Sequence, residues 1–188
     1  MITHFHPDLL EYTGEQLHSH FAYKKFALLG DSIVSFIGPC RVEKERLVDL
    51  EDQRREEKIY SPRMLHFIVE TFDRDLAKAV LLQRLLVVVV EEVLKAELGV
   101  QGLRLRRSGD DLFDGGHKLS VSIATVSPVS SLIHFALNVS AKGTPVPAKG
   151  LEEYGEVDIP GLAKKVMASF VSEMESVEKA RLKVRAVP

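Results

Sequence analysis

The chain has 188 residues, of which 45% are hydrophobic and 28% are charged, an ordinary balance for a globular protein. This length suits one domain with a sizeable core, and we expect that domain to cover residues 1–188. The formal net charge of −2 provides no basic field, so we expect no nucleic-acid partner. The single cysteine, Cys40, excludes an internal disulfide and fits a reducing compartment.

No targeting or membrane segment is expected. The N-terminus has no basic segment followed by an apolar core. The most apolar run, residues 79–90, is interrupted by Gln83 and Arg84 and is too short to span a bilayer. The expected location is the cytoplasm.

The first forty residues predict a strand, a helix and a second strand. Residues 1–12 indicate a short strand and a turn. The segment 13–16 is typical of a capping box, which would open a helix that ends at Gly30. A buried strand is predicted over 32–37, where Gly38-Pro39 would stop it.

Residues 41–63 form the most charged segment of the chain, and two interpretations stay open. One is a solvated loop or short helix whose charges neutralise each other. The other is a flap that folds over a phosphate-bearing ligand, because long irregular segments in compact domains are often lids. Arg54, Arg55 or Arg63 would then pair with phosphate oxygens.

A strand over 64–71 and a long helix follow. His66 on this strand is interpreted as a structural histidine, with a place in a cleft as the alternative. Asp73 or Asp75 is the expected cap of the helix, which ends at Gly99. Its middle is apolar nearly all round, so we expect it to lie between the sheet and another element.

The middle of the chain predicts three strands around a polar site. The turn 114–116, Asp-Gly-Gly, predicts a hairpin, because glycine accepts positive φ at no steric cost. It separates a strand ending at Asp110 and Asp111 from a strand that begins with Lys118. A third strand, 131–140, is mostly apolar.

Alternation along the second of these strands defines the surroundings of Lys118. Lys118 shares its predicted face with Ser120, Ser122 and Ala124, and the apolar core lies behind the other face. The neighbouring carboxylates of Asp110 and Asp111 would point to opposite faces, so one can approach Lys118 while the other meets solvent or a cation. The plainer interpretation is a cross-strand Asp–Lys ion pair, which contributes little when exposed.

The C-terminal part predicts a loop, a helix and a short last segment. Residues 140–155 are rich in proline, glycine and lysine, with Lys142 and Lys149 as candidates for anion contact. Asp158 is the expected cap of the helix, with Pro160 in its first turn. Residues 181–187 alternate basic with apolar residues and predict a short strand or an ordered tail.

The segment LRLRRSGDDLFDGGHKLS resembles the central segment of the biotin and lipoate protein ligases. There, an acidic pair precedes a glycine turn and the catalytic lysine, and Asp110-Asp111 and Lys118 match these positions. The strand ending at Asn138 and the segment Tyr60-Ser61-Pro62 are similar to further ligase segments. The whole chain is also identified as a member of the domain-of-unknown-function family numbered 366.

The chain departs from the ligase pattern at several positions. Arg54-Arg55 falls where the ligases have their adenylate loop, but the surrounding residues lack the glycines of that loop. Val121 stands where the ligases have a glycine after the lysine. The Arg-Arg-x-Ser-Gly-Gly-Gly segment of lipoate ligases is not found.

The resemblance implies an α+β fold, with a mixed, mainly antiparallel sheet backed by helices, as in class II aminoacyl-tRNA synthetases and biotin ligases. It implies formation of an acyl-adenylate from a carboxylic acid with ATP and Mg²⁺, no bound prosthetic group, and a homodimer. The implied roles are Lys118 as catalytic residue, Asp110 or Asp111 as ligand to Mg²⁺, Arg54, Arg55 and Arg63 on the phosphates, and Asn138 at the base of the site.

Two other functions stay open. One is a non-catalytic module of the same fold that binds a nucleotide, an acyl group or a protein partner, as the missing glycines permit. The other is acyl transfer through Cys40 without ATP. A buried, inert thiol is the favoured interpretation of Cys40, since it sits in no matching motif.

Overall fold

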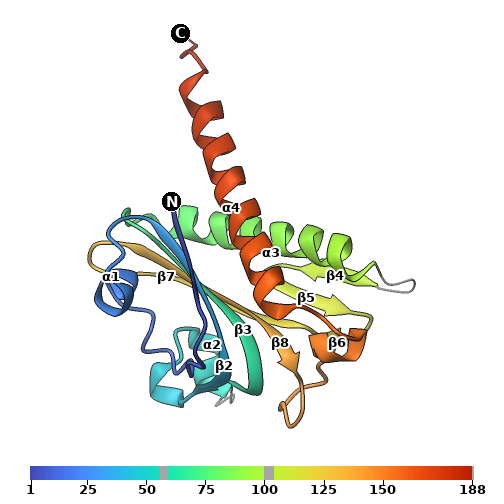
Figure 1. Ribbon diagram of the computed structural model, residues 1–188. Coiled ribbons are helices and arrows are strands. Elements are labelled where there is room, and N and C mark those ends of the chain that lie inside the picture. Colours follow the sequence, from blue (N-terminus) through green and yellow to red (C-terminus); the bar gives the residue numbers. More distant parts are fainter. Residues whose placement is uncertain (56–58, 100–103, 188) are drawn as a thin grey trace.

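The computed structural model describes residues 1–55, 59–99 and 104–187, and it has an α+β fold (Figure 1). The main sheet has the spatial order β1 (Ile2–His6), β2 (Ser32–Val42), β3 (Ile59–Thr71), β8 (Ser131–Ser140) and β7 (Ser120–Val126). Strand β1 runs parallel to β2, and the other neighbours are antiparallel. A small second sheet consists of β4 (Leu105–Ser108), β5 (Asp111–Asp114) and β6 (His117–Lys118). The mixed, mainly antiparallel sheet confirms the predicted fold class.

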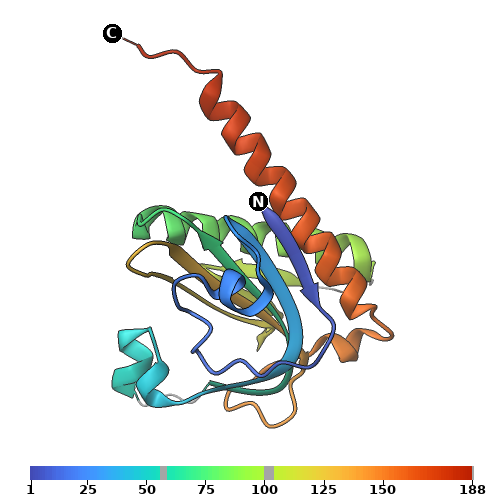
Figure 2. The same ribbon diagram turned by 60° about the vertical axis from the view of Figure 1, so that its left-hand side comes forward.

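Helices cover one face of the main sheet (Figures 1 and 2). Helix α3 (Leu76–Leu98) lies over β7 and β8, and α4 (Ile159–Leu182) lies over β1 and β2. The inward residues of the sheet on this face are aliphatic or aromatic, as Leu65, Phe67 and Phe135 illustrate. Burying this surface, at roughly 25 cal/mol per Å² of apolar area, gives the main stabilisation of the fold.

The opposite face of the sheet is covered only in part. The segment that runs from Leu10 to Leu28, including the short helix α1 (Phe21–Phe26), packs on β2 and β3 and forms a second apolar cluster. Helix α2 (Leu50–Arg55) lies further along this face, beyond the 3₁₀ turn Lys44–Arg46 (Figure 2). The candidate functional site lies on this face.

The first predicted helix is much shorter than expected. The side chain of Gln16 makes the predicted contact with the start of the segment, because its Oε1 accepts a hydrogen bond from the Thr13 amide at 3.1 Å. No helix begins at this point. Helix α1 covers only Phe21–Phe26 and ends at Ala27 in the left-handed region, with φ 57°. The capping pattern here closes a turn, and packing of Phe21 against the sheet decides where the helix forms.

Strand β2 continues past Gly38 and Pro39, which were expected to stop it. A bulge lies between Gly38 and Cys40, and pairing with β3 resumes beyond it up to Val42. A bulge is one of the few places where a strand tolerates proline, because the missing N–H costs no ladder bond there. Gly38 also lets another chain segment approach: a Cβ added there would lie 2.0 Å from the carbonyl oxygen of Leu10.

The charged segment 41–63 contains regular secondary structure at both ends and in its middle. Its start completes β2, its middle holds α2, and its last residues begin β3, so Arg63 lies in a strand rather than in a loop.

The two long helices confirm their predicted caps. Asp75 accepts a hydrogen bond from the Lys78 amide at the start of α3, and Asp158 accepts one from the Gly161 amide at the start of α4.

Two predictions for strands need correction. The segment before the Asp-Gly-Gly turn is a hairpin of its own rather than one strand, because β4 ends at Ser108 and β5 begins at Asp111 after a turn. The turn after β5 adopts the expected positive φ at Gly115, 60°. At the C-terminus, α4 continues to Leu182, so the predicted short strand over 181–187 does not form.

We expect the variant Gly38→Ala to lower the free energy of unfolding by about 1–3 kcal/mol, since the added methyl must displace the Leu10 carbonyl. The matched control is Gly116→Ala, where an added Cβ meets no atom within 4 Å. Urea denaturation of both variants measures the difference. Equal stabilities of the two variants would contradict the close packing of the Leu10 segment on β2.

Candidate functional site

A cavity of about 150 Å³ lies on the open face, between the ends of β3, β6 and β8. Lys118 and Asn138 line it, as does Val121 from β7. Tyr60 and Ser61 of β3 form a further wall. The loop after β8 closes one side with Thr144, Pro145, Val146 and Ala148. The cavity therefore joins three of the segments on which the resemblance to the ligases rests.

The main chain of Lys118 is held from two sides. On one side it pairs with Phe113 of β5. On the other, its N–H donates to the Pro147 carbonyl and its carbonyl accepts from the Lys149 amide, both at 3.0 Å. Asn138 adds a side-chain hydrogen bond to the same carbonyl at 3.3 Å. The backbone of Lys118 is thereby fixed at the edge of the cavity.

Asp114 ties the loop after β8 to the small sheet. Its carboxylate accepts hydrogen bonds from Lys149 Nζ at 2.7 Å, from the Tyr154 hydroxyl at 2.8 Å and from the Arg104 amide at 3.0 Å. These three donors lower the pKa of Asp114 despite its partial desolvation. Lys149, expected as a candidate for anion contact, therefore has a structural role in this network.

The side chain of Lys118 forms the predicted ion pair with one of the two neighbouring carboxylates. Its Nζ lies 2.9 Å from Oδ2 of Asp111, and both side chains are about one-quarter to one-third exposed. Desolvation raises the pKa of Asp111, and the ammonium of Lys118 opposes this rise. The pair lies at the edge of the cavity, which Lys118 lines.

Asp110 turns away from the cavity toward helix α3. Its carboxylate accepts hydrogen bonds from Gln83 Nε2 at 2.8 Å and from Arg84 Nη1 at 3.0 Å. Asp110 and Asp111 therefore engage separate cationic or amide partners. Among the described residues, no group of three or more His, Cys, Asp or Glu side chains could hold a metal ion. The arrangement does not fit a Mg²⁺ site built from both carboxylates.

The predicted phosphate-binding arginines lie outside the cavity. Arg54 and Arg55 are on α2, where Arg55 pairs with Glu51 one turn earlier at 3.4 Å. Arg63 is exposed on β3, opposite Ser140 of β8. Asp52, from the same turn of α2 as the arginine pair, is the residue of this helix that borders the cavity. The roles of the three arginines stay predictions.

The side chains along β7 point to the faces of the sheet opposite to the predicted ones. Ser122 pairs with Phe135 on the helix side and accepts a hydrogen bond from Gln83 of α3 at 2.7 Å. Val121 and Ile123 face the open side. The break at Leu119, between β6 and β7, changes the phase, so the face of Lys118 cannot be counted forward along β7.

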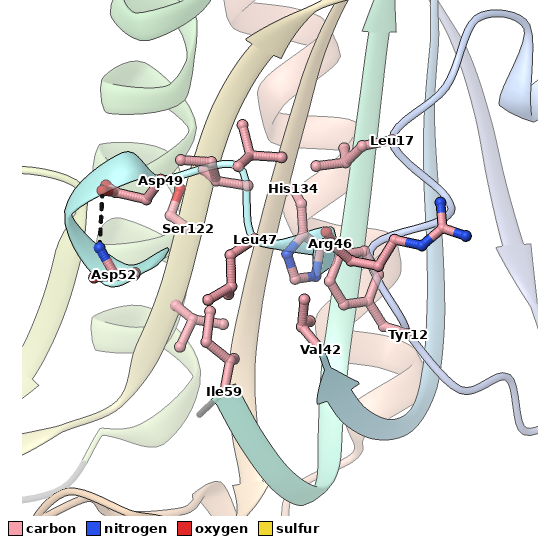
Figure 3. Close-up of a pocket in the computed structure, with 13 residues that line it drawn as sticks. Tyr12, Leu17, Val42, Arg46, Leu47, Asp49, Asp52, Ile59, Ser122 and His134 are labelled. Atoms are coloured by element: carbon pink, nitrogen blue, oxygen red, sulfur yellow. Dashed lines mark hydrogen bonds between the residues drawn. The ribbon is translucent and has the colours of Figure 1, made fainter. Parts of the chain in front are cut away.

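A second, smaller cavity of about 60 Å³ adjoins the first (Figure 3). Asp52, Ile59, Val121 and Ser122 line both cavities. The rest of its lining is mixed: the apolar residues are Leu17, Val42, Leu47, Val48 and Ile123, and the residues with polar groups are Tyr12, Arg46, Asp49 and His134. In Figure 3 the imidazole of His134 lies between the side chains of Leu47 and Tyr12.

Two buried histidines lie side by side under this second cavity. Nδ1 of His66 is 3.0 Å from Nε2 of His134, and Nε2 of His66 is 3.1 Å from the Gly38 carbonyl. Burial lowers the pKa of His66 to about 4 and also lowers that of His134, so both rings are neutral at pH 7. The ring of Tyr12 stacks on His134, with centroids 3.6 Å apart.

His66 is thus the structural histidine that the sequence indicated, while His134 and Tyr12 were not singled out as site residues. The signal for His134 was a histidine inside an otherwise apolar strand. Tyr12 had no such signal, because its position depends on the packing of the N-terminal segment.

Cys40 is fully buried, and desolvation raises the pKa of its thiol to about 12, which favours the inert interpretation.

A family model described as a domain of unknown function, DUF366, matches residues 1–185. The chain belongs to this family. It is 38% identical over 181 residues to an uncharacterised protein of Methanocaldococcus jannaschii, covering 93% of this chain and 80% of that protein. The structure of a protein of unknown function from Pyrococcus horikoshi is 41% identical with a TM-score of 0.91, covering 99% of this chain and 100% of the other.

More distant structures have the fold of known ligases. Biotin protein ligase from Aquifex aeolicus, solved with biotin and ATP, is 14% identical with a TM-score of 0.65 and aligns over 94% of this chain and 72% of the ligase. A putative lipoate protein ligase from T. acidophilum with bound lipoic acid is 15% identical with a TM-score of 0.53, over 93% and 87% of the two chains. These likenesses show the shared fold.

In the described part of this DUF366 chain, no helix is long and apolar enough to cross a membrane.

The buried histidines predict a specific pH dependence of stability. The unfolded chain binds a proton at His66 near pH 6.5, whereas the folded chain resists it until about pH 4. The free energy of unfolding is therefore expected to be constant above pH 6.5 and to fall by up to ~3 kcal/mol between pH 6.5 and 4 from this residue alone.

Urea denaturation of the wild type and of His66→Gln at pH 7 and pH 4.5 measures this effect. The variant should lose less stability than the wild type over that interval, because it has no ring to protonate. Replacing the exposed His117 by Asn is the control and should leave the pH profile as it is. An unchanged slope in His66→Gln would contradict a neutral buried ring.

Proposed function

We propose that this DUF366 protein activates a carboxylic acid with ATP and forms an acyl-adenylate. The observation that carries the proposal is the lysine: Lys118 lines the cavity, its backbone is fixed on two sides, and it follows the Asp-Gly-Gly turn as in the ligase pattern. The shared fold of biotin and lipoate protein ligases, which bind ATP, biotin or lipoic acid in their own structures, supports the same reaction type.

The proposed reaction is a displacement at phosphorus. A carboxylate oxygen of the acid forms a bond to the α-phosphorus of ATP, and the bond from this phosphorus to the oxygen of the β-phosphate breaks. The products are acyl-adenylate and pyrophosphate. The ammonium of Lys118 would stabilise the negative charge that grows on the oxygens of the α-phosphate, the kind of preorganised contact that contributes most to such reactions.

The surroundings of Lys118 suit this role. The 2.9 Å ion pair with Asp111 limits the rotation of the lysine side chain. The cavity of about 150 Å³ is below the roughly 300–1,000 Å³ typical of small-molecule sites. It would therefore take the carboxylate and the neighbouring phosphate, while the rest of the nucleotide lies outside. Mg²⁺ would be carried by the phosphates and water rather than by the two aspartates, because Asp110 is bound to Arg84.

The binding-module alternative rests on Val121. This side chain occupies the position of the ligase glycine and lines both cavities, which narrows the space beside Lys118. Such a module would bind an acid or a nucleotide without making pyrophosphate. The two functions therefore differ in one measurable product.

Pyrophosphate release tests the proposal. We expect the wild type to release pyrophosphate from ATP–Mg²⁺ in the presence of its acid, and Lys118→Ala to lower the rate at least about 100-fold. The matched control Lys142→Ala removes an exposed lysine of the neighbouring loop and should keep the wild-type rate. Circular dichroism checks that both variants are folded. Full activity of folded Lys118→Ala would overturn the proposed mechanism.

A further inference from the structure

The two cavities of the open face meet at Val121. Both are lined by Asp52, Ile59, Val121 and Ser122, so these four residues form their common boundary. The hydroxyl of Ser122 accepts a hydrogen bond from Gln83 on the helix side of the sheet. Ile59 and Val121 are the apolar members of the boundary, and both pack against the second apolar cluster.

The register of the main sheet explains why Val121 stands at this boundary. Asn138, Ala136 and His134 follow one another on the open face of β8 at steps of two residues. Asn138 lines the larger cavity, and His134 lines the smaller one. Val121 pairs with Ala136, the residue between them. Because Ala136 has a methyl side chain, the larger side chain of Val121 determines how much space connects the two cavities.

The positions along β8 limit the length of an acid that binds in the larger cavity. Asn138 and Ala136 are two residues apart, which is about 7 Å at roughly 3.4 Å per residue. A chain of about five carbons spans this distance, at roughly 1.5 Å per carbon–carbon bond. The volume agrees, because about 150 Å³ holds about ten water-sized groups at roughly 15 Å³ each. An acid of about five carbons takes about seven of these positions and leaves about three for oxygens of the α-phosphate.

The lining of the larger cavity suits an acid whose other end is uncharged. Lys118 and Asn138 lie together, since Nδ2 of Asn138 donates to the Lys118 carbonyl. Within the described part of the chain, Lys118 is the one cation that lines this cavity, so a second carboxylate would have no cationic partner there. The apolar lining residues are Ile59, Met64, Val121, Pro145, Val146 and Ala148. Contacts with these side chains stabilise an alkyl chain, whereas a charged end would lose its hydration beside them.

We propose that Val121 is a specificity-determining residue, which restricts the bound acid to an aliphatic chain of about four to six carbons with an uncharged end. The chain would run from Lys118 along β8 and end against the side chain of Val121. A longer acid would need the space of the smaller cavity, which lies beyond Val121. This inference rests on the proposed function for the class of ligand, and it names the substrate class.

A series of straight-chain acids tests the length limit by binding, without turnover. Calorimetry measures the affinity of each acid from propanoate to decanoate, together with the non-hydrolysable ATP analogue in which methylene joins the α- and β-phosphates. The affinity of the wild type should rise roughly fourfold with each added methylene up to about pentanoate and should not rise further up to decanoate. Binding of 5-aminopentanoate should be weaker than binding of pentanoate, because its end is charged.

Substitutions at Val121 should move this limit in opposite directions. In Val121→Ala the affinity should keep rising up to octanoate, because the smaller cavity of about 60 Å³ adds about four positions at roughly 15 Å³ each. Octanoate should then bind at least about tenfold more tightly than it binds to the wild type. Val121→Leu should move the limit to shorter acids. The control Val126→Ala, at the exposed end of β7, should keep the limit of the wild type. Circular dichroism checks that the variants are folded.

Several outcomes would overturn the inference. These are a wild-type affinity that keeps rising to decanoate, an unchanged limit in folded Val121→Ala, tighter binding of 5-aminopentanoate than of pentanoate, or no binding of any acid. The wild-type series decides the length limit even where a variant does not fold. A length limit that depends on Val121, without pyrophosphate release, would keep this inference while refuting adenylate formation. Pyrophosphate release that is as fast with decanoate as with pentanoate would do the reverse.

Discussion

The fixed main chain of Lys118 is the constraint on which the candidate site depends. Its N–H and carbonyl are bound by the loop after β8, while Phe113 pairs with it from the small sheet. The carboxylate of Asp114 joins the same loop to the small sheet through Lys149 and Tyr154. A lysine side chain is long and flexible, so a rigid backbone is what makes its charge available at one place.

The two faces of the main sheet have different roles: one stabilises the fold, and the other carries the candidate site. The face toward α3 and α4 is apolar and close-packed, which supplies the stability. The other face carries a serine, an asparagine and two histidines among its buried residues. The N-terminal segment, the segment after β2 and the loop after β8 cover it in part. Each of these buried polar groups costs free energy unless it is hydrogen-bonded. The network from Gly38 through His66 to His134 pairs both ring nitrogens of His66 and Nε2 of His134.

Local signals in the sequence were reliable where short-range interactions decide the structure. The caps at Asp75 and Asp158 and the turn at Gly115 formed as predicted, because each involves atoms only a few residues apart. The helix expected up to Gly30 did not form over that length, since packing on the sheet outweighed the local pattern. Of the strand or ordered tail expected over 181–187, the strand did not form, because α4 continues to Leu182. The continuation of β2 past Gly38 was also missed, because its pairing with β3 and the close approach of Leu10 involve distant segments.

The sequence by itself determined the α+β fold and the family resemblance, because both follow from motifs of contiguous residues. It also singled out Lys118 and Asn138, which line the same cavity. Only the tertiary structure decided the partners of the two neighbouring aspartates, with Asp111 on Lys118 and Asp110 on Arg84. It also brought His134 together with Tyr12, which lies more than a hundred residues away along the chain. The physical reason is that side-chain direction changes at the break at Leu119, and contacts between distant segments depend on how the whole sheet packs.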